Sequence, residues 1–185
     1  MEAIGENLNH YGGNLMELWD IYDRDRQPLL RTHRRGEKKN PGEYHIVVEV
    51  WTVNRDGHVL VTLRDPCKEM YPDKWENTGG SALAGETSRQ AAVRELAEET
   101  GIVAAEEELT FLGTFREEEE FHDTYILRRD VAIDQLTMQK GETVAAKWVT
   151  MERLNAMAAD ETLALPIGKR LNQIRQEMER TLAYE

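Results

Sequence analysis

The order of apolar and polar residues along the chain predicts a series of short strands. Residues 44–53 (YHIVVEVWTV) are rich in the β-branched and aromatic side chains that favour extended structure. Asp56-Gly57 is a hairpin signal, so residues 58–64 (HVLVTLR) are expected to return as the partner strand. The same composition predicts further strands at residues 75–78, 109–115, 124–131 and 143–149.

Apolar positions spaced three and four residues apart predict helices at the end of the chain. In residues 166–181, one apolar stripe is formed by Ile167, Leu171, Ile174 and Met178, and Pro166 suits the first helical turn. A shorter helix is expected at residues 151–158. Strands interrupted by a central helix and followed by two terminal helices predict an α/β fold of the α+β type, with a mixed sheet between helical layers. We expect the stripe to pack in the core, with a dimer contact as the alternative.

The central helix has both of its ends marked in the sequence. Thr87 and Gln90 have the form of a capping box, in which the hydroxyl satisfies a free backbone N–H. Gly101 is placed to end the helix, because glycine adopts the left-handed conformation without a Cβ penalty. Within the helix, Glu95, Glu98 and Glu99 share one arc of the surface. A hard divalent cation such as Mg²⁺ would reverse the repulsion between these carboxylates, and a solvated acidic face is the alternative.

The N-terminal part of the chain is expected to extend a single domain at residues 15–185. Residues 1–14 predict a mobile arm, and the segments 15–22 and 29–33 predict a hairpin within an extension at 15–40. The catalytic core is expected at 41–160 and a C-terminal helix at 161–185. An excess of positive charge between Arg24 and Lys39 predicts either a contact with an anion or a solvated loop.

Composition excludes several classes of function. The chain has 185 residues and a net charge of −12, which argues against binding to a nucleic acid polymer. No apolar run approaches the ~20 residues that span a bilayer, so we expect no membrane partner. Cys67 is the single cysteine, which fits a cytoplasmic location, and we expect its thiol to be inert.

The spacing around the central helix completes a long motif. From Gly80, five residues lead to Glu86, and seven more lead to the run Arg94-Glu95-Leu96-Ala97-Glu98-Glu99-Thr100-Gly101-Ile102. This pattern resembles the signature of the Nudix hydrolase family at every fixed position. The resemblance implies an αβα sandwich, a loop–helix–loop that binds Mg²⁺ or Mn²⁺, and cleavage of a diphosphate linkage in a small molecule, of which a nucleoside diphosphate type is our expectation.

The resemblance also implies roles for individual residues. Glu95, Glu98 and Glu99 would ligate one to three metal ions, with the carbonyl of Gly80 as a further ligand. Arg94 would orient these carboxylates by a salt bridge, and Glu86 would fix the loop to the helix.

The general base is left open between Glu95 and Glu142, which precedes the strand at 143–149. The acidic run 117–120 is expected to be a solvated loop, with Glu119, Glu120 or Asp123 as reserve metal ligands.

The substrate-contacting residues are expected outside the signature. Arg64 ends a strand before a loop where relatives often hold phosphate, and His45 and Glu49 share one face of the strand at 44–53. Trp51, Trp75 and Tyr125 are expected to pack in the core, although each has a ring that could stack on a base. The N-terminal hairpin could cover the site or form a homodimer contact.

Two rival functions follow from the same resemblance. The segments ELWDIYDRD, GEYHIVVEVW and KWENTGG resemble the branch that includes isopentenyl-diphosphate isomerase. However, Gly79 stands at the position of the isomerase's catalytic cysteine and Ser81 at that of a metal-binding histidine, which favours hydrolysis. A ligand-binding protein without catalytic activity is the third possibility, and the complete signature argues against it.

Overall fold

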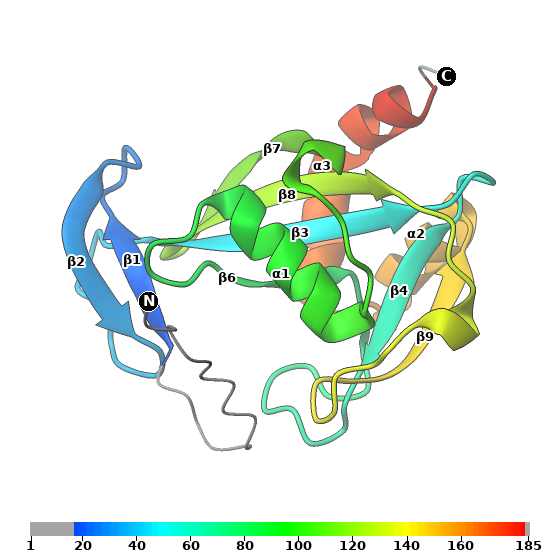
Figure 1. Cartoon of the computed structure of the whole chain (residues 1–185), viewed down its shortest axis with the longest axis horizontal. Coiled ribbons are helices and arrows are strands. Elements are labelled where there is room, and N and C mark those ends of the chain that lie inside the picture. Colours follow the sequence, from blue (N-terminus) through cyan, green and yellow to red (C-terminus); the bar gives the residue numbers. More distant parts are fainter. Residues whose placement is uncertain (1–16, 184–185) are drawn as a thin grey trace, which may run out of the picture.

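A computed structural model describes residues 17–183, which form a mixed sheet between two helical layers (Figure 1). The predicted arm at residues 1–14 lies outside the described residues. The strands are β1 (Leu18–Tyr22), β2 (Pro28–Arg34), β3 (His45–Val53), β4 (Val59–Arg64), β5 (Trp75–Glu76), β6 (Thr78–Ser81), β7 (Leu109–Glu117), β8 (Glu120–Arg128) and β9 (Thr143–Val149). The helices are α1 (Ser88–Thr100), α2 (Met151–Ala159) and α3 (Leu165–Ala183), with 3-10 turns at Glu106–Glu108 and Ile133–Gln135. None of these helices is long and apolar enough to cross a membrane.

The main sheet is built around the parallel pair β3 and β8. These two strands stay in register from His45 and Glu120 to Val53 and Arg128, and the order β5-β4-β3-β8-β7 is otherwise antiparallel. Strand β6 pairs with the first half of β3, and β9 pairs with β4. Because β3 carries neighbours along its whole length, it positions the chain that enters the glycine pair at Gly79 and Gly80.

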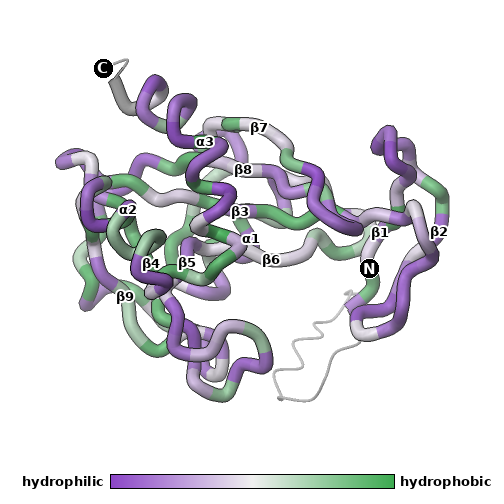
Figure 2. Tube along the Cα trace, turned by 180° about the vertical axis from the view of Figure 1, so that it is seen from behind, coloured by the Kyte–Doolittle hydropathy of each residue, from purple (hydrophilic) through white to green (hydrophobic). Residues whose placement is uncertain are grey.

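Alternate residues of β3 face two separate apolar cores. Val48 and Val50 pack with Leu96 of α1, whereas Trp51 and Val53 pack with α2 and α3. This period of two places α1 on one face of the sheet and the two terminal helices on the other (Figures 1 and 2). The predicted α+β sandwich is therefore confirmed.

The expected core positions are buried. The stripe of α3 lies in the core and consists of Ile167, Leu171, Ile174 and Met178. Trp51 and Tyr125 are also buried, and Trp75 is half-buried against the same core as α3. The prediction of core packing is confirmed for this stripe.

One predicted boundary is wrong. The strand expected at 124–131 begins four residues earlier, at Glu120, and β7 continues to Glu117, so only Glu118 and Glu119 form the turn. The acidic run is thus not a solvated loop. β8 pairs with β3 over its full length, which favours the longer strand. The cost of placing charges in the strands is reduced because Arg170 pairs with Glu117 and His122 pairs with Glu120.

The N-terminal strands form the hairpin that the sequence predicts. β1 pairs with β2 in a separate two-stranded sheet that stands beyond one end of β3 (Figure 1). Tyr22 and Tyr44 exchange two backbone hydrogen bonds of 2.8 and 2.9 Å, and the Trp19 ring stacks on His45 with a centroid distance of 4.1 Å. These contacts fasten the hairpin to the start of β3.

Arg170 of α3 is a buried cation in the layer between α3 and the sheet. Its guanidinium pairs with Glu49 of β3 and, at 2.8 Å, with Glu117 of β7, and its side chain is 8% exposed. Arg170→Ala would leave Glu49 buried without its counter-ion. We therefore expect the free energy of unfolding, measured by urea denaturation, to fall by about 3–5 kcal/mol. The neighbouring exposed cation, Lys169, provides the control. Lys169→Ala should change the free energy of unfolding by less than about 0.5 kcal/mol. Equal effects of the two substitutions would contradict the buried pairing.

Candidate active site

Helix α1 begins and ends at the predicted residues. The Thr87 hydroxyl accepts a hydrogen bond from the Gln90 backbone N–H (3.2 Å), and the Gln90 side chain accepts one from the Thr87 N–H (2.9 Å). Gly101 has φ 74°, the left-handed conformation that glycine favours. Ala91, Ala92 and Leu96 are buried against the sheet. With its ends and its apolar face fixed, the helix presents its acidic arc at a defined angle.

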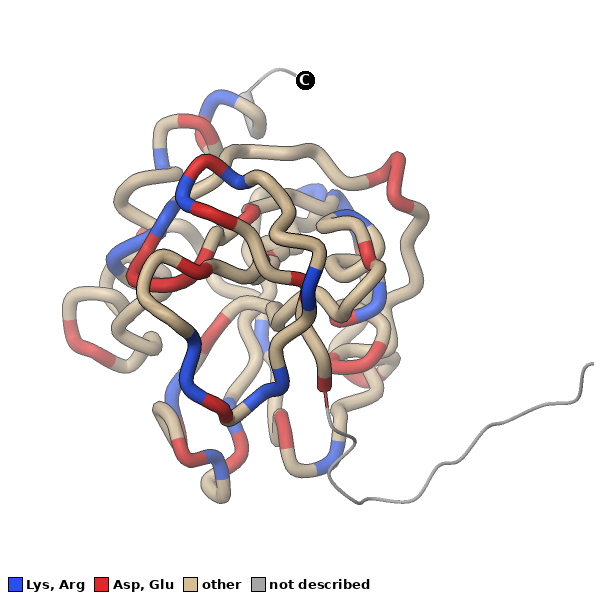
Figure 3. The backbone as a smooth tube through the Cα atoms, turned by 90° about the vertical axis from the view of Figure 1, so that its left-hand side faces the viewer, with Lys and Arg blue, Asp and Glu red and all other residues tan. Residues whose placement is uncertain are grey.

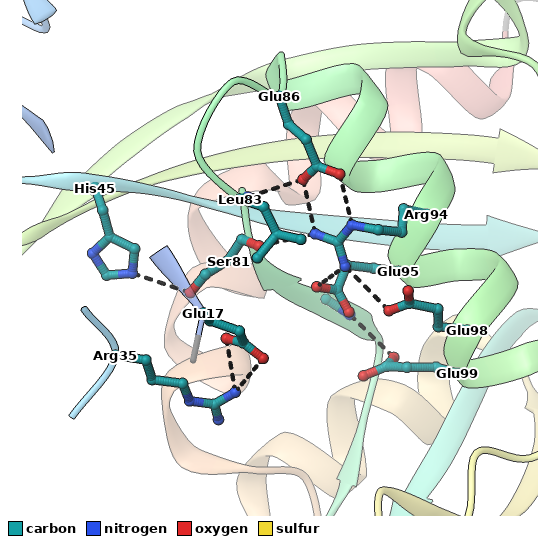
Figure 4. Close-up of polar contacts among 11 residues, drawn as sticks. Glu17, Arg35, His45, Ser81, Leu83, Glu86, Arg94, Glu95, Glu98 and Glu99 are labelled. Carbon is teal, nitrogen blue, oxygen red and sulfur yellow. Dashed lines mark hydrogen bonds and ion pairs between the residues drawn. The ribbon is translucent and has the colours of Figure 1, made fainter. Parts of the chain in front are cut away.

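Arg94 joins most of the acidic side chains of the signature (Figure 4). Its guanidinium donates to both carboxylate oxygens of Glu86 (2.7 and 2.9 Å), to Glu95 (2.8 Å) and to Glu98 (3.1 Å). It also donates to the backbone carbonyl of Ser81 (3.1 Å). Burial disfavours its charge, but the hydrogen bonds to Glu86 and the charge of Glu95 raise the pKa of Arg94. These contacts place Arg94 between three of the acidic side chains.

Glu86 ties the loop to the helix. Besides Arg94, its carboxylate accepts a hydrogen bond from the backbone N–H of Leu83 (2.9 Å). Burial opposes the charge of Glu86, but these hydrogen bonds outweigh it and lower the pKa of the carboxyl group. Glu86 thus remains a carboxylate that fixes the loop, which is the role expected from the sequence.

The Glu95 carboxylate occupies the space that a side chain at Gly80 would fill. A Cβ atom at Gly80 would overlap the Glu95 carboxylate, so a larger residue there would require the Glu95 side chain to move. Burial raises the pKa of Glu95, the charge of Arg94 lowers it, and the charges of Glu98 and Glu17 raise it further. The backbone of Gly80 and the carboxylate of Glu95, both in the expected ligand set, therefore lie side by side.

Glu99 is the most deeply buried acid of the helix. Its side chain accepts a hydrogen bond from the backbone N–H of Gly79 (3.3 Å), and the residue is 6% exposed. Burial raises the pKa of Glu99 well above its ordinary range, and the charges of Glu76 and Glu95 add to that effect. Glu99 thus lies where a cation would relieve both the burial cost and the repulsion.

Glu76 of β5 belongs to the same acidic cluster, although the sequence did not single it out. It pairs with Arg64 at 2.6 Å, and the two side chains are 12% and 16% exposed. Burial raises the pKa of Glu76 to about 7 although the charge of Arg64 lowers it. A glutamate three residues before the glycine pair, inside a predicted strand, was the signal that could have pointed to it.

Glu142 is brought to this cluster by the start of β9. It forms an ion pair with Lys68, and its charge contributes to raising the pKa values of Glu76 and Glu99. The adjacent Thr143 hydroxyl donates to the backbone carbonyl of Glu99 (3.3 Å). Glu142 therefore lies beside the signature carboxylates, where the sequence placed a candidate general base.

All three of the expected substrate residues have partners inside the protein. Lys39 donates to Nδ1 of His45 (2.8 Å), and Nε2 of His45 lies 3.1 Å from the Ser81 hydroxyl. Glu49 lies opposite Gly79 in the pairing of β3 with β6, but it faces α3 and pairs with Arg170. Arg64, as described, pairs with Glu76.

The reserve metal ligands are engaged away from the signature. Asp123 is 2% exposed and accepts hydrogen bonds from Arg26 (2.7 Å) and the Thr114 hydroxyl (2.6 Å). Glu120 lies 2.8 Å from Nε2 of His122. These contacts leave the helix acids, Glu76 and Glu142 as the acidic cluster around Gly80.

The donor set of this cluster fits a hard divalent cation. It consists of carboxylate oxygens and the Gly80 carbonyl, which are the ligands that Mg²⁺ and Mn²⁺ take. The raised pKa values of Glu95 and Glu99 show carboxylates that repel one another in a buried place. Within residues 17–183, no three acidic, histidine or cysteine side chains already lie at metal-binding distances from one another. Side-chain rotation away from Arg94 is therefore expected when a cation binds.

Comparison with known proteins identifies the family to which the chain is similar. The NUDIX domain family matches residues 43–167. A Nudix hydrolase of Listeria monocytogenes (lmo0368) is 41% identical over 143 residues, which cover 77% of this chain and 85% of that protein. The crystal structure of DR0079 from Deinococcus radiodurans superposes with a TM-score of 0.70 at 22% identity, over 86% of this chain and 98% of that one.

The likeness to an isomerase is confined to a short segment. An isopentenyl-diphosphate Δ-isomerase of Salmonella heidelberg is 36% identical over 59 residues, which cover 31% of this chain and 33% of that protein. The hydrolase matches extend over a larger share of the chain, so the isomerase branch has only weak support.

The burial of His45 makes stability depend on pH. Burial and the charge of Lys39 lower the pKa of His45 from 6.5 to about 4. Between pH 6.5 and 4, His45 is protonated in the unfolded chain but neutral in the folded protein. The free energy of unfolding therefore falls as the pH falls through this range. We expect a loss of about 3 kcal/mol from this residue, measured as urea stability across that range. In His45→Gln, the loss of unfolding free energy between pH 6.5 and pH 4 should be smaller by that amount. The same loss in this variant as in the wild type would contradict the account.

Proposed function

This chain belongs to the Nudix family and is a hydrolase of pyrophosphate bonds, and from that premise we propose that it cleaves a nucleoside diphosphate-type small molecule with Mg²⁺ or Mn²⁺. The observation that carries the proposal is the Arg94 contact network, which gathers Glu86, Glu95 and Glu98 beside the buried Glu99. A single cationic side chain is bound by three acids there, so the site still has an excess of negative charge.

The proposed mechanism assigns each group a distinct task. Glu95, Glu98, Glu99 and the carbonyl of Gly80 would hold the metal. When bound, the ion would offset charge on the phosphate oxygens and lower the pKa of a bound water. Diphosphate hydrolysis requires an aligned water and charge stabilisation more than covalent chemistry.

The proton acceptor is proposed to be Glu95 or Glu142. Burial raises the pKa of Glu95, which suits a group that must take a proton from water. Glu142 has the advantage of position, since it lies at the rim of the cluster and is 37% exposed. Arg64 would contact a phosphate, and His45 and Glu49 would contact the group attached to it.

The isomerase alternative is disfavoured by the residues at the entrance to the signature. Gly79 has no side chain for proton transfer, and Ser81 is engaged with His45. Cys67 is exposed in the β4–β5 loop, where its Sγ atom lies 3.8 Å from the carbonyl of Gly141. A binding protein without catalysis is disfavoured by the intact Arg94 network. The cytoplasmic location, the division into an extension and a core, and the homodimer stay predictions.

Removing one charge at a time from the signature tests the proposal. Purified protein with Mg²⁺ is assayed against nucleoside di- and triphosphates, sugar nucleotides, dinucleotides and prenyl diphosphates. We expect Glu98→Gln and Glu99→Gln each to lower hydrolysis at least about 100-fold, because each removes a metal ligand. Glu107→Gln, at an exposed acid outside the cluster, should leave the rate unchanged.

Two outcomes would contradict this assignment. Hydrolysis that persists in both signature variants would show that the metal site lies elsewhere. Conversion of isopentenyl to dimethylallyl diphosphate by the wild-type protein would instead establish the isomerase alternative.

A further inference from the structure

The N-terminal hairpin forms part of the wall of the active site. The backbone N–H of Ala84 donates to the carbonyl of Leu18 (2.8 Å), and that of Gly85 donates to the Asp20 carboxylate (2.8 Å). Between these two residues of β1, Trp19 stacks on His45, which in turn contacts Ser81. Three successive residues of the hairpin therefore hold the signature loop.

This attachment places Arg35 beside the acidic cluster. The backbone N–H of Arg35 donates to the carbonyl of Glu17 (2.9 Å), and its guanidinium donates to both Glu17 carboxylate oxygens (2.9 and 3.0 Å). In the view of Figure 4, the Glu17 carboxylate lies between the Arg35 guanidinium and Glu95. The charge of Glu17 also contributes to raising the pKa of Glu95. Glu17 thus lies within electrostatic range of Glu95, one of the proposed metal ligands, and Arg35 is bonded to Glu17.

The other cations near the site are held more firmly. Arg94 is bound by three glutamates, and Arg64 pairs with Glu76 where both side chains are mostly buried. The Arg35 and Glu17 side chains are 60% and 35% exposed, and exposed ion pairs contribute at most about 1 kcal/mol. An incoming anion can therefore displace Glu17 at little cost.

The basic segment of the hairpin is mostly neutralised within the protein. Arg26 pairs with Asp123 and Arg31 with Glu43. Figure 3 shows positive and negative residues interspersed over this end of the molecule instead of gathered in one patch. Arg35 differs from Arg26 and Arg31 in its position beside the signature loop and its double hydrogen bond to an exposed carboxylate.

We propose that Arg35 binds a phosphate group of the diphosphate substrate, which takes the place of the Glu17 carboxylate. The guanidinium fork that now holds two carboxylate oxygens has the geometry to hold two phosphate oxygens. The metal would neutralise the phosphates from the side of α1, and Arg35 would do so from the side of the hairpin. The inference rests on the proposed function, and it assigns a substrate-binding role to a segment outside the signature.

Binding of a diphosphate that cannot be hydrolysed tests this role directly. Methylenediphosphonate is titrated into the full chain with Mg²⁺ by calorimetry. Arg35→Ala should weaken binding about 10-fold or more, because charge-assisted hydrogen bonds are lost. Arg35→Lys should give an intermediate affinity, since the charge stays but the fork is lost. The matched control is Arg31→Ala, which removes a paired cation of the adjacent strand β2 and should leave the affinity unchanged.

Glu17→Gln separates binding from a structural role. If phosphate replaces the Glu17 carboxylate, removing its charge should tighten binding. If the pair only holds the hairpin in place, Glu17→Gln should weaken binding as much as Arg35→Ala does. Weaker binding in Glu17→Gln would overturn the inference. So would an unchanged affinity in Arg35→Ala, or a wild-type protein that does not bind methylenediphosphonate.

The test is independent of turnover. Weakened binding in Arg35→Ala without hydrolysis of any compound in the substrate panel would support the phosphate contact and contradict the proposed substrate class. Thermal unfolding of each variant shows whether the hairpin and the core remain folded.

Discussion

The active site depends on holding several like-charged carboxylates in one partly buried place. Each such acid repels its neighbours and loses hydration, and both costs are visible in the raised pKa values of Glu95 and Glu99. Arg94 offsets part of this cost by hydrogen bonding to Glu86, Glu95 and Glu98 together. The remaining negative charge supports the proposal that the cluster binds a divalent cation. Under that proposal, folding and metal binding would be linked through the same side chains.

The surrounding fold supplies the rigidity that this arrangement needs. The parallel pairing of β3 with β8 aligns the sheet, and β6 runs along β3 to bring the glycine pair up to the end of α1. The absence of a side chain at Gly80 lets that backbone meet Glu95. The β1–β2 hairpin then holds the loop from its other side, through Leu18 and Asp20. In this way segments far apart in sequence converge on one short loop.

Local signals in the sequence predicted the local features well. The capping box at Thr87, the left-handed Gly101 and the apolar stripe of α3 depend on residues a few positions apart, and each is found where it was expected. The roles of Arg94 and Glu86 were implied by the family resemblance, and their contacts with each other are consistent with those roles. The misplaced start of β8 and the overlooked Glu76 have a different origin, because both depend on partners distant in sequence. Glu120 joins a strand because β3 pairs with it, and Glu76 joins the cluster because the fold of β5 and β6 brings it to Glu99.

The position of the bound metal is the most direct test of this account. Crystals grown with Mn²⁺ would give an anomalous difference peak that locates the ion without reference to activity. We expect a peak bounded by the carboxylates of Glu95, Glu98 and Glu99 and the carbonyl of Gly80, and its loss in Glu99→Gln. A peak at another cluster, or none at saturating Mn²⁺, would contradict the claim that these residues form the metal site.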